Sequence, residues 1–321
     1  MFLEILMIII GFVLLIIGAD FLVKGSSNIA AKFHIPEMLI GLTIVALGTS
    51  APELIITITS ASKGATELII GNAIGSNICN LLLILGLMAV IRPVEIEKEA
   101  KNIHIPIAFL ATLLILSMGI GILGSKSGVI NGRDGTILVI MFIFYFSYPI
   151  ITEINDIVKS FKSRKDKSEQ KGKSVILSII YIIMGIILLK YGGDFVVDYS
   201  TDIAQMYNVS ERVIGLTIVA IGTALPELVT SIFAVAKNDT DLAVGNLVGS
   251  CVLNLFLILG VGAIITPLSF SSEFNQNLIL LAASTLLIWL FNFIGKKSII
   301  TRKNGIILLF IFSIYMLNLF I

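Results

Sequence analysis

Two glutamates, Glu53 and Glu227, stand where a membrane protein would place residues that bind ions. Each follows a proline within a long apolar stretch, in Gly48-Thr49-Ser50-Ala51-Pro52-Glu53 and Gly222-Thr223-Ala224-Leu225-Pro226-Glu227. A carboxylate at the centre of a bilayer costs about 2.5 to 3.5 kcal/mol on insertion scales, so an acid in such a segment indicates a functional site. Two acids at matched positions, 174 residues apart, strengthen this interpretation.

Serine, threonine and asparagine recur around both glutamates at helical spacing, so oxygen atoms would line one helix face. In the first copy these residues are Thr49, Ser50 and Thr57, then Asn72, Ser76, Asn77 and Asn80. In the second copy they are Thr223 and Ser231, then Asn246, Ser250 and Asn254. Any one of them could serve helix packing alone. Oxygen-only ligands with two carboxylates suit hard cations such as Ca²⁺ and Na⁺, whereas Zn²⁺ or copper would favour His or Cys.

The prolines predict main-chain ligands as well. Pro52 has no N–H and Gly48 weakens the helix before it, so the carbonyls from Ala46 to Thr49 are expected to be free to bind a cation. Pro226 would have the same effect on the carbonyls from Ala220 to Thr223. A simple kink is the alternative, because Pro and Gly are frequent in membrane helices. The glutamate after each proline favours an ion site.

The whole chain is far more apolar than a soluble domain. Of its 321 residues 57% are hydrophobic and 13% charged, against about 25% charged in typical globular domains, and the mean hydropathy is +1.03. The apolar stretches are about 20 residues long without strand-like alternation, which favours spanning helices over a transmembrane barrel. We predict an all-α membrane protein with ten transmembrane helices, at 3–23, 36–63, 66–91, 102–123, 134–154, 175–197, 211–236, 239–265, 276–295 and 305–321.

The distribution of lysine and arginine predicts the orientation in the membrane. With the N-terminus outside, 17 of the 22 basic residues fall in cytoplasmic loops, four fall in external loops and Lys190 lies within a span. Cytoplasmic loops of membrane proteins carry an excess of Lys and Arg. We therefore expect a multi-pass plasma-membrane protein with both termini extracellular and the basic loop 155–174 in the cytoplasm.

The chain contains an internal duplication with an offset of 174 residues. Segments 41–54 and 215–228 agree at 11 of 14 positions, and segments 71–86 and 245–260 agree at 10 of 16. Each copy would hold five spans, an odd number, so the two repeats must be inverted, as in secondary transporters that bind substrate between the halves. The predicted units are a first five-helix repeat at 1–154 with its motif at 41–86, a cytoplasmic linker at 155–174, and a second repeat at 175–321 with its motif at 215–260.

Other polar residues in the spans have simpler interpretations. Asp20 and Asp194 are expected to be ordinary carboxylates near the ends of the first and sixth spans. His34 and His104 also lie near span ends, so we expect both at the membrane interface.

At the motifs around the two glutamates, the sequence resembles the sodium/calcium exchangers of the cation/calcium exchanger superfamily, especially the compact prokaryotic members. The two alpha-repeats of that family carry motifs like Gly-Thr-Ser-x-Pro-Glu and Gly-Asn-x-x-Gly-Ser-x-x-x-Asn. Both motifs occur twice here, in order, and the resemblance spans nearly the whole chain. It implies a secondary active antiporter that exchanges Na⁺ for Ca²⁺ through a shared midplane site and expels Ca²⁺ from the cell.

The resemblance also implies roles for individual residues. Glu53 and Glu227 would be shared by Ca²⁺ and Na⁺, and the main-chain carbonyls of Thr49 and Thr223 would complete the calcium site. The flanking sodium sites would be lined by Ser50, Ser76 and Ser250 and by the carbonyls of Ala46 and Ala220. The centre of the site would hold Asn80 and Asn254.

The sequence departs from the family pattern at two positions. Ala224 lacks a hydroxyl that members usually present to a sodium site, and Asn254 stands where some members carry Asp. A related branch that exchanges protons for calcium carries Glu at the positions of Gly75 and Gly249, so the glycines disfavour proton coupling. Because the two buried glutamates are themselves titratable, exchange of H⁺ for Ca²⁺, or of another divalent cation, on the same scaffold is the alternative.

Other classes of function fit the sequence poorly. A membrane-embedded serine protease would need His or Lys beside its nucleophile, and none lies within the central spans. We expect no enzymatic activity, no cofactor and no nucleic-acid partner; the transported ions Ca²⁺ and Na⁺ and membrane lipid are the expected partners of a monomer. The family resemblance and the small residues Gly11, Gly18, Gly185 and Gly192 predict that the first and sixth spans slide against the other eight.

Overall fold

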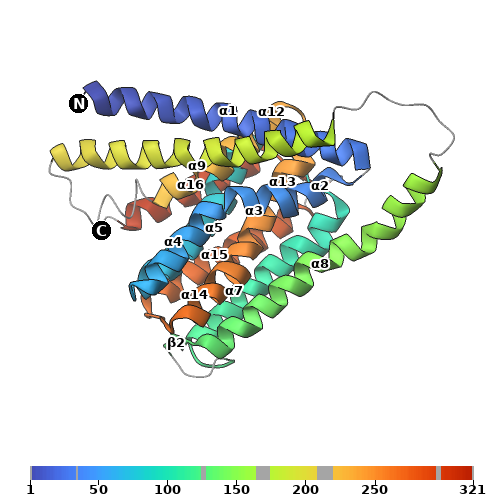
Figure 1. The fold of residues 1–321 in the computed structure, drawn as a ribbon. Coiled ribbons are helices and arrows are strands. Elements are labelled where there is room, and N and C mark those ends of the chain that lie inside the picture. The colour runs from blue at the N-terminus through green and yellow to red at the C-terminus, as the bar shows by residue number, and fades with distance from the viewer. Residues whose placement is uncertain are drawn as a thin grey trace.

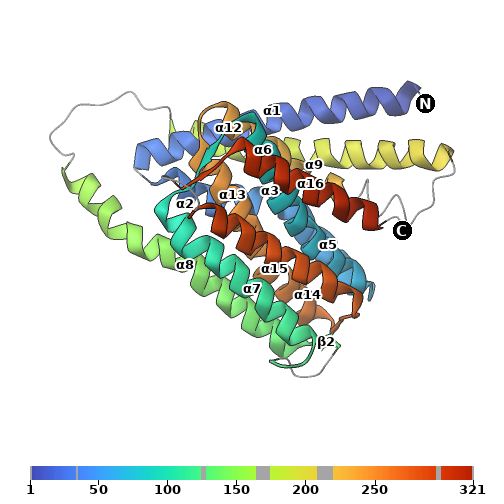
Figure 2. The same ribbon diagram turned by 180° about the vertical axis from the view of Figure 1, so that it is seen from behind.

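The computed structural model is a helical bundle in which two long helices lie side by side across the remaining ones (Figure 1). It describes residues 2–33, 35–123, 128–163, 174–207, 220–293 and 298–319. His34 lies outside the described residues. So do residues 211–219, the first part of the predicted seventh span. Figure 2 shows the opposite side, where α15 and α16 cover the bundle.

The helices of the two halves follow each other in matching order. The first half contains α1 (Phe2–Phe33), α2 (Glu37–Ile40), the π-helix η1 (Gly41–Val45), α3 (Ala46–Thr49), α4 (Ala51–Ser62), α5 (Thr66–Ile78), η2 (Cys79–Ile84), α6 (Leu85–Ile91), η3 (Ala100–His104), α7 (Ile105–Gly119) and α8 (Gly132–Ser163). The second half contains α9 (Val175–Met206), α11 (Ala220–Thr223), α12 (Leu225–Ala236), α13 (Thr240–Leu253), η6 (Asn254–Ile258), α14 (Leu259–Ile265), α15 (Glu273–Phe291) and α16 (Arg302–Leu319).

The described residues include six helices that are long and apolar enough to cross a membrane. A seventh is formed if Glu37–Thr49 and Ala51–Ser62, which meet at a bend of 45°, count as one span. The all-helical membrane fold is thus confirmed, while the number of ten spans stays a prediction. Several helices also run past their apolar stretch: α8 continues to Ser163, inside the predicted linker, because no Gly or Pro interrupts residues 155–163.

The long helices α1 and α9 are held together by a ladder of small residues. Gly11 faces Gly192 and Gly18 faces Gly185, so the two helices are antiparallel. An added Cβ at Gly11, Gly18 or Gly25 would lie only 2.7 to 3.0 Å from a backbone oxygen of α9. Small residues of this kind let membrane helices approach closely, and here they make α1 and α9 one unit.

Two short antiparallel strand pairs tie the halves together. Strand β1 (Val94–Glu95) pairs with β4 (Ile299–Ile300), and β2 (Val129–Ile130) pairs with β3 (Leu268–Ser269). In each pair, one strand comes from the first half of the chain and the other from the second half. Each also joins two loops that the Lys and Arg distribution assigns to the same side of the membrane.

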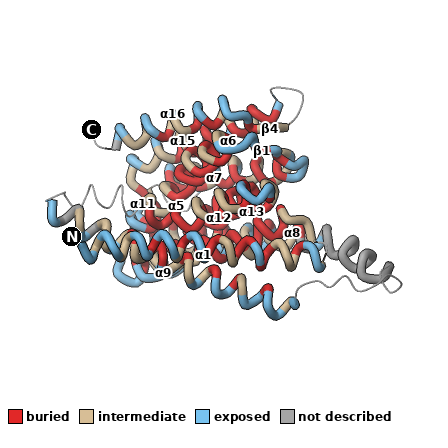
Figure 3. Tube along the Cα trace, turned by 90° about the horizontal axis from the view of Figure 1, so that it is seen from above, coloured by how far each residue is buried: buried red, intermediate tan, exposed pale blue. Residues whose placement is uncertain are grey.

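Buried residues concentrate in the helices behind α1 and α9. Viewed from above, α5, α12 and α13 are mostly buried while α1 and α9 lie along one edge (Figure 3). About three quarters of the apolar windows in Thr66–Ile91 and Thr240–Ile265 are buried, at 72% and 78%, against 22% in α1. The two most buried spans are those that follow the Pro-Glu motifs, so the polar residues on them lie at the centre of the protein.

Gly71 and Gly245 are equivalent in the two repeats but differ in their surroundings, which gives a matched stability test. A Cβ at Gly245 would lie 2.4 Å from the Met38 carbonyl oxygen, whereas a Cβ at Gly71 would meet nothing nearer than 3.8 Å. We expect Gly245→Ala to destabilise the protein by about 1 to 3 kcal/mol through overpacking, and Gly71→Ala to change little. Thermal unfolding in detergent would check this; equal midpoints for the two variants would contradict it.

Candidate functional site

The two glutamates lie on the inward faces of α4 and α12. Glu53 and Glu227 are each only 1% exposed, and Thr57 is fully buried, while Ile55 on the opposite face of α4 is 50% exposed. The predicted helical face of oxygen atoms is therefore confirmed for α4.

Serine hydroxyls connect the two halves at this centre. Ser50 Oγ donates a 2.8 Å hydrogen bond to Glu227 Oε1 and lies 3.1 Å from Ser250 Oγ. All three side chains are at least 99% buried. The structure thus brings together residues that are separated by 177 and 200 positions in the sequence.

Two threonine–asparagine pairs repeat the same contact in both halves. Thr49 Oγ1 donates to Asn246 Oδ1 at 3.1 Å, and Thr223 Oγ1 donates to Asn72 Oδ1 at 3.3 Å. These pairs are related by the 174-residue offset of the duplication. Asn246 also donates through Nδ2 to Ser231 Oγ at 3.1 Å, so both ends of its amide are hydrogen-bonded.

The helix breaks before each glutamate, as the prolines predict. Ser50, with φ −87° and ψ 8°, separates α3 from α4, and Ala224 has nearly the same backbone angles between α11 and α12. The prediction of free carbonyls needs correcting at Ala46, whose oxygen accepts a 3.0 Å hydrogen bond from the Ser50 N–H. The physical reason is the spacing: the N–H that Pro52 lacks would have bonded to Gly48, two residues after Ala46. In the second half, Ala220 is the first residue of α11.

Many oxygens of the cluster are buried without a hydrogen-bond partner. Buried polar groups in proteins are nearly always paired, so several unpaired ones at one place indicate a ligand site. Among the described residues, the unpaired oxygens of the predicted set are Glu53 Oε1 and Oε2, Glu227 Oε2, Thr57 Oγ1, Ser76 Oγ, Asn80 Oδ1 and Asn254 Oδ1. This donor set contains only oxygen, with two carboxylates, and therefore fits a hard cation.

Asn77 fixes the orientation of Asn254. Asn77 Nδ2 donates to the main-chain carbonyl of Cys251 at 3.0 Å, and Asn77 Oδ1 accepts from Asn254 Nδ2 at 2.9 Å. A main-chain carbonyl can only accept, so Asn77 must turn its NH₂ group toward Cys251 and its oxygen toward Asn254. That oxygen in turn requires the NH₂ group of Asn254 as its donor. Asn254 therefore turns its carbonyl oxygen, not its NH₂ group, away from Asn77. The sequence placed Asn77 among the polar residues but gave it no role.

The remaining predictions concern residues outside the cluster. His104 is buried within the protein, at only 2% exposed, and its Nδ1 lies 3.1 Å from the Tyr145 hydroxyl; its place at the membrane interface stays a prediction. It is the last residue of η3, the turn that precedes α7. Asp20 on α1 forms an ion pair with Lys24 at 2.5 Å, and Asp194 on α9 forms one with Lys190 at 2.7 Å.

Comparisons with known proteins agree on one family. A family model described as "Sodium/calcium exchanger protein" matches residues 3–151 and 177–321. The chain is 30% identical over 350 residues to the sodium/calcium exchanger MaX1 of Methanosarcina acetivorans, covering 98% of each. A solved structure of the sodium-calcium exchanger NCX_Mj superposes with a TM-score of 0.82 at 32% identity, over 98% of this chain and 97% of that chain. The Ca²⁺/H⁺ antiporter ChaA of Bacillus subtilis is 25% identical over 213 residues, 63% of this chain and 60% of that protein.

The hydrogen bonds of Asn77 predict that it acts through Asn254. We expect Asn77→Ala to weaken Ca²⁺ binding about tenfold, or 1.4 kcal/mol, because Asn254 can then rotate its NH₂ group toward the site. In an Asn254→Ala background the same change should add little, since the residue that Asn77 positions is gone. Calcium titration of the purified variants, with thermal unfolding as the control for folding, measures both; additive losses would refute this role.

Proposed function

Because the chain belongs to the sodium/calcium exchanger family, we propose that it exchanges Na⁺ for Ca²⁺ across the membrane through one site that both ions share. The related proteins are exchangers of Na⁺ or H⁺ for Ca²⁺, so antiport of a cation against Ca²⁺ is common to them. The observation that carries the proposal is the buried cluster of unpaired oxygens around the two glutamates. Ca²⁺ takes six to eight oxygen ligands, often carboxylates, carbonyls and hydroxyls, and the cluster offers that chemistry.

We assign the ions as follows. Glu53 and Glu227 bind Ca²⁺ together with the main-chain carbonyls of Thr49 and Thr223, and the same carboxylates bind Na⁺ in the alternative state. The sodium sites use Ser50, Ser76, Ser250, the carbonyl of Ala220 and the second lone pair of the Ala46 carbonyl, whose first lone pair accepts from the Ser50 N–H. The centre between them is occupied by Asn80 and Asn254, with the Asn254 oxygen presented by Asn77.

The shared carboxylates supply the coupling. Ca²⁺ and Na⁺ cannot bind together if both need Glu53 and Glu227, so one must leave before the other enters. An empty site would carry two unpaired charges away from water, which costs several kcal/mol, so only loaded states change conformation. Inward sodium movement then drives Ca²⁺ out of the cell.

The proposal includes an arrangement in the membrane. The repeats 1–154 and 175–321 are inverted, both termini are extracellular, and the loop 155–174 lies in the cytoplasm of a plasma-membrane monomer. Alternating access results from sliding of α1 and α9, which the glycine ladder makes one unit, against the core that holds the site.

Transport into proteoliposomes tests the proposal directly. An outward-directed sodium gradient should drive uptake of radioactive calcium by purified protein, and collapsing that gradient should stop it. A proton gradient of the same size is the control. Uptake driven by protons and not by sodium would favour the Ca²⁺/H⁺ alternative that the relative ChaA represents; no uptake in either case would refute antiport.

Removing either central charge should abolish transport. In Glu53→Gln or Glu227→Gln, one carboxylate must compensate a divalent ion in a low-dielectric site, so calcium uptake should fall to background. Expression and thermal unfolding should be nearly unchanged, because neither Glu53 oxygen has a hydrogen-bond partner to lose and the amide oxygen introduced by Glu227→Gln can still accept from Ser50. Near-normal sodium-driven uptake in either variant would mean that the site is elsewhere.

Position 224 should limit sodium affinity. Ser50 donates to Glu227, whereas its counterpart Ala224 is a buried methyl, and neither oxygen of Glu53 has a partner. A missing neutral ligand costs on the order of 1 to 3 kcal/mol, so Ala224→Ser should raise apparent external sodium affinity by about 5- to 150-fold. Calcium affinity should change much less, because its proposed ligands are present already. An unaltered sodium dependence of exchange would show that residue 224 does not face a sodium site.

A further inference from the structure

The helices α4 and α12 end in the same backbone motif, one in each half of the chain. The residues after the last turn, Gly64 and Asn238, are left-handed, with φ of 73° and 67°. Both ends close with a 2.9 Å hydrogen bond to a carbonyl five residues earlier, from Ala65 to Ser60 and from Asp239 to Ala234. The residues before them, Lys63 and Lys237, therefore occupy equivalent positions in the two repeats.

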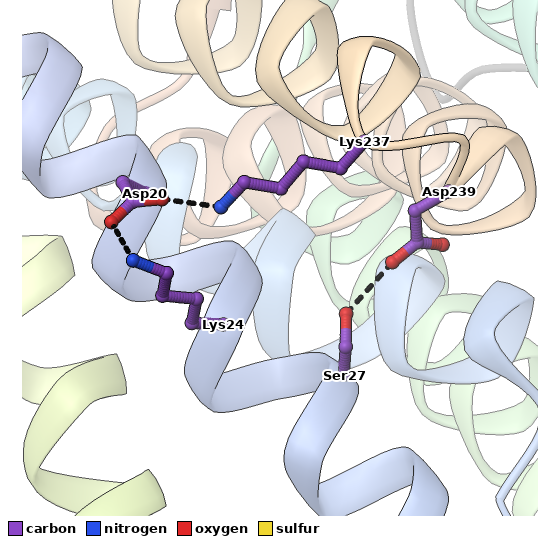
Figure 4. A network of polar contacts seen from close by, with 5 residues as sticks. All are labelled: Asp20, Lys24, Ser27, Lys237 and Asp239. Atoms are coloured by element: carbon purple, nitrogen blue, oxygen red, sulfur yellow. Dashed lines mark hydrogen bonds and ion pairs between the residues drawn. The ribbon is translucent and has the colours of Figure 1, made fainter.

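Lys237 ties the end of α12 to α1. Its Nζ pairs with Asp20 Oδ1, while Lys24 pairs with Asp20 Oδ2, so Asp20 lies between two cations (Figure 4). Two residues past Lys237, Asp239 Oδ2 accepts a 2.7 Å hydrogen bond from Ser27 Oγ (Figure 4). The contact therefore joins the α1–α9 unit to the core helices α12 and α13.

The equivalent pair is not formed at the other end of the molecule. By the 174-residue offset, Asp194 on α9 corresponds to Asp20, and Lys63 corresponds to Lys237. Asp194 instead pairs with Lys190 of its own helix at 2.7 Å. Lys63 makes no ion pair with any residue in the described part of the chain.

The two aspartates lie on either side of the centre of the α1–α9 unit. Because Gly11 faces Gly192 and Gly18 faces Gly185, Asp194 lies level with residue 9 of α1. That is eleven residues from Asp20, or about 16 Å along the helix at 1.5 Å per residue. A rigid movement of the unit that takes Asp20 away from Lys237 also moves Asp194, whose partner by the inverted repeat would be Lys63.

We propose that Asp20–Lys237 and Asp194–Lys63 are two alternating latches, each of which holds the transporter closed on one side. The inference rests on the proposed antiport mechanism and adds the contacts that mark its two end states. In the present conformation the Lys237 latch, on the side predicted to be cytoplasmic, is engaged. The Lys63 latch engages in the opposite state.

The two latches are unequal. Asp239, which accepts the bond from Ser27, corresponds to Ala65, which has no acceptor side chain. The Lys237 side thus has a second contact that the Lys63 side lacks. A cavity of about 330 Å³ lies beside the contact and is lined mostly by polar side chains, among them Lys24, Ser27, Asn28 and Glu37.

Single lysine substitutions test the latches, because removing one latch or the other should shift the balance between the two end states in opposite directions. An exposed ion pair shifts a two-state equilibrium about 1.4- to fivefold. Lys237→Met should change the ratio of half-saturating sodium on the two membrane faces by that factor, and Lys63→Met should change it in the opposite direction. Lys24→Met is the matched control, because it removes a partner of Asp20 on the same helix and should leave the ratio unaltered. Shifts in the same direction, or none, would overturn the proposal.

Cross-linking provides a test that does not depend on transport. A short bismaleimide should join cysteines introduced by Asp20→Cys and Lys237→Cys, and, in a separate variant, by Asp194→Cys and Lys63→Cys. The native Cys79 and Cys251 are buried and should not react. Each cross-link should stop exchange, and sodium or calcium should alter the yields of the two in opposite directions. If the second pair is never joined under any ion condition, the latches do not alternate. If instead the wild type shows no exchange, the antiport proposal fails while the cross-linking still decides the latches.

Discussion

The structure depends on one electrostatic constraint: two carboxylates lie at the centre of a protein that is surrounded by hydrocarbon. Glu53 and Glu227 are 1% exposed, and three of their four oxygens have no hydrogen-bond partner. In such an environment two carboxylates are tolerable only with a cation between them or with a proton on one of them. The breaks at Ser50 and Ala224 serve this constraint, because they place the N-terminal ends of α4 and α12, the positive ends of the helix dipoles, beside the acids.

The duplication explains why the two halves of the site are alike and where they differ. Where both copies keep their residues, the contact appears twice, as in Thr49–Asn246 and Thr223–Asn72. Where the two copies carry different residues, the contact forms in one half only: Ser50 bonds to Glu227, but Ala224 has no hydroxyl to bond to Glu53. Likewise Asn77 orients Asn254, while the residue equivalent to Asn77 is Cys251, which cannot orient Asn80 in the same way. The two ends of the site therefore differ in their hydroxyl and amide ligands, although both carboxylates are kept.

The sequence predicted the membrane class, the family and the residues that surround the glutamates, because each depends on residue type and helical spacing. It failed where neighbours from the other half decide the outcome. The burial of His104 depends on Tyr145 of α8, and the partner of Asn77 is a main-chain carbonyl 174 residues away. Helix ends such as that of α8 were also missed, since the apolar pattern marks the membrane and not the end of the hydrogen-bonded helix. The π-helices η2 and η6, which begin at or beside Asn80 and Asn254, have no recognised sequence signal either.

Two interactions of very different free energy act in the proposed transport cycle: the pair of buried carboxylates at the site and an ion pair near the surface. An unoccupied pair of buried carboxylates costs several kcal/mol, so in the proposed mechanism ion occupancy decides whether α1 and α9 can move at all. The ion pair between Asp20 and Lys237 is partly exposed, with side chains 23% and 35% accessible, and pairs of this kind contribute about 0.2 to 1 kcal/mol. A term of that size cannot prevent or permit the movement, but in the proposed cycle it would set which end state the loaded protein occupies more often. In the proposed mechanism, Glu53 and Glu227 therefore supply the coupling, whereas residues that never touch the ion set the preferred resting side.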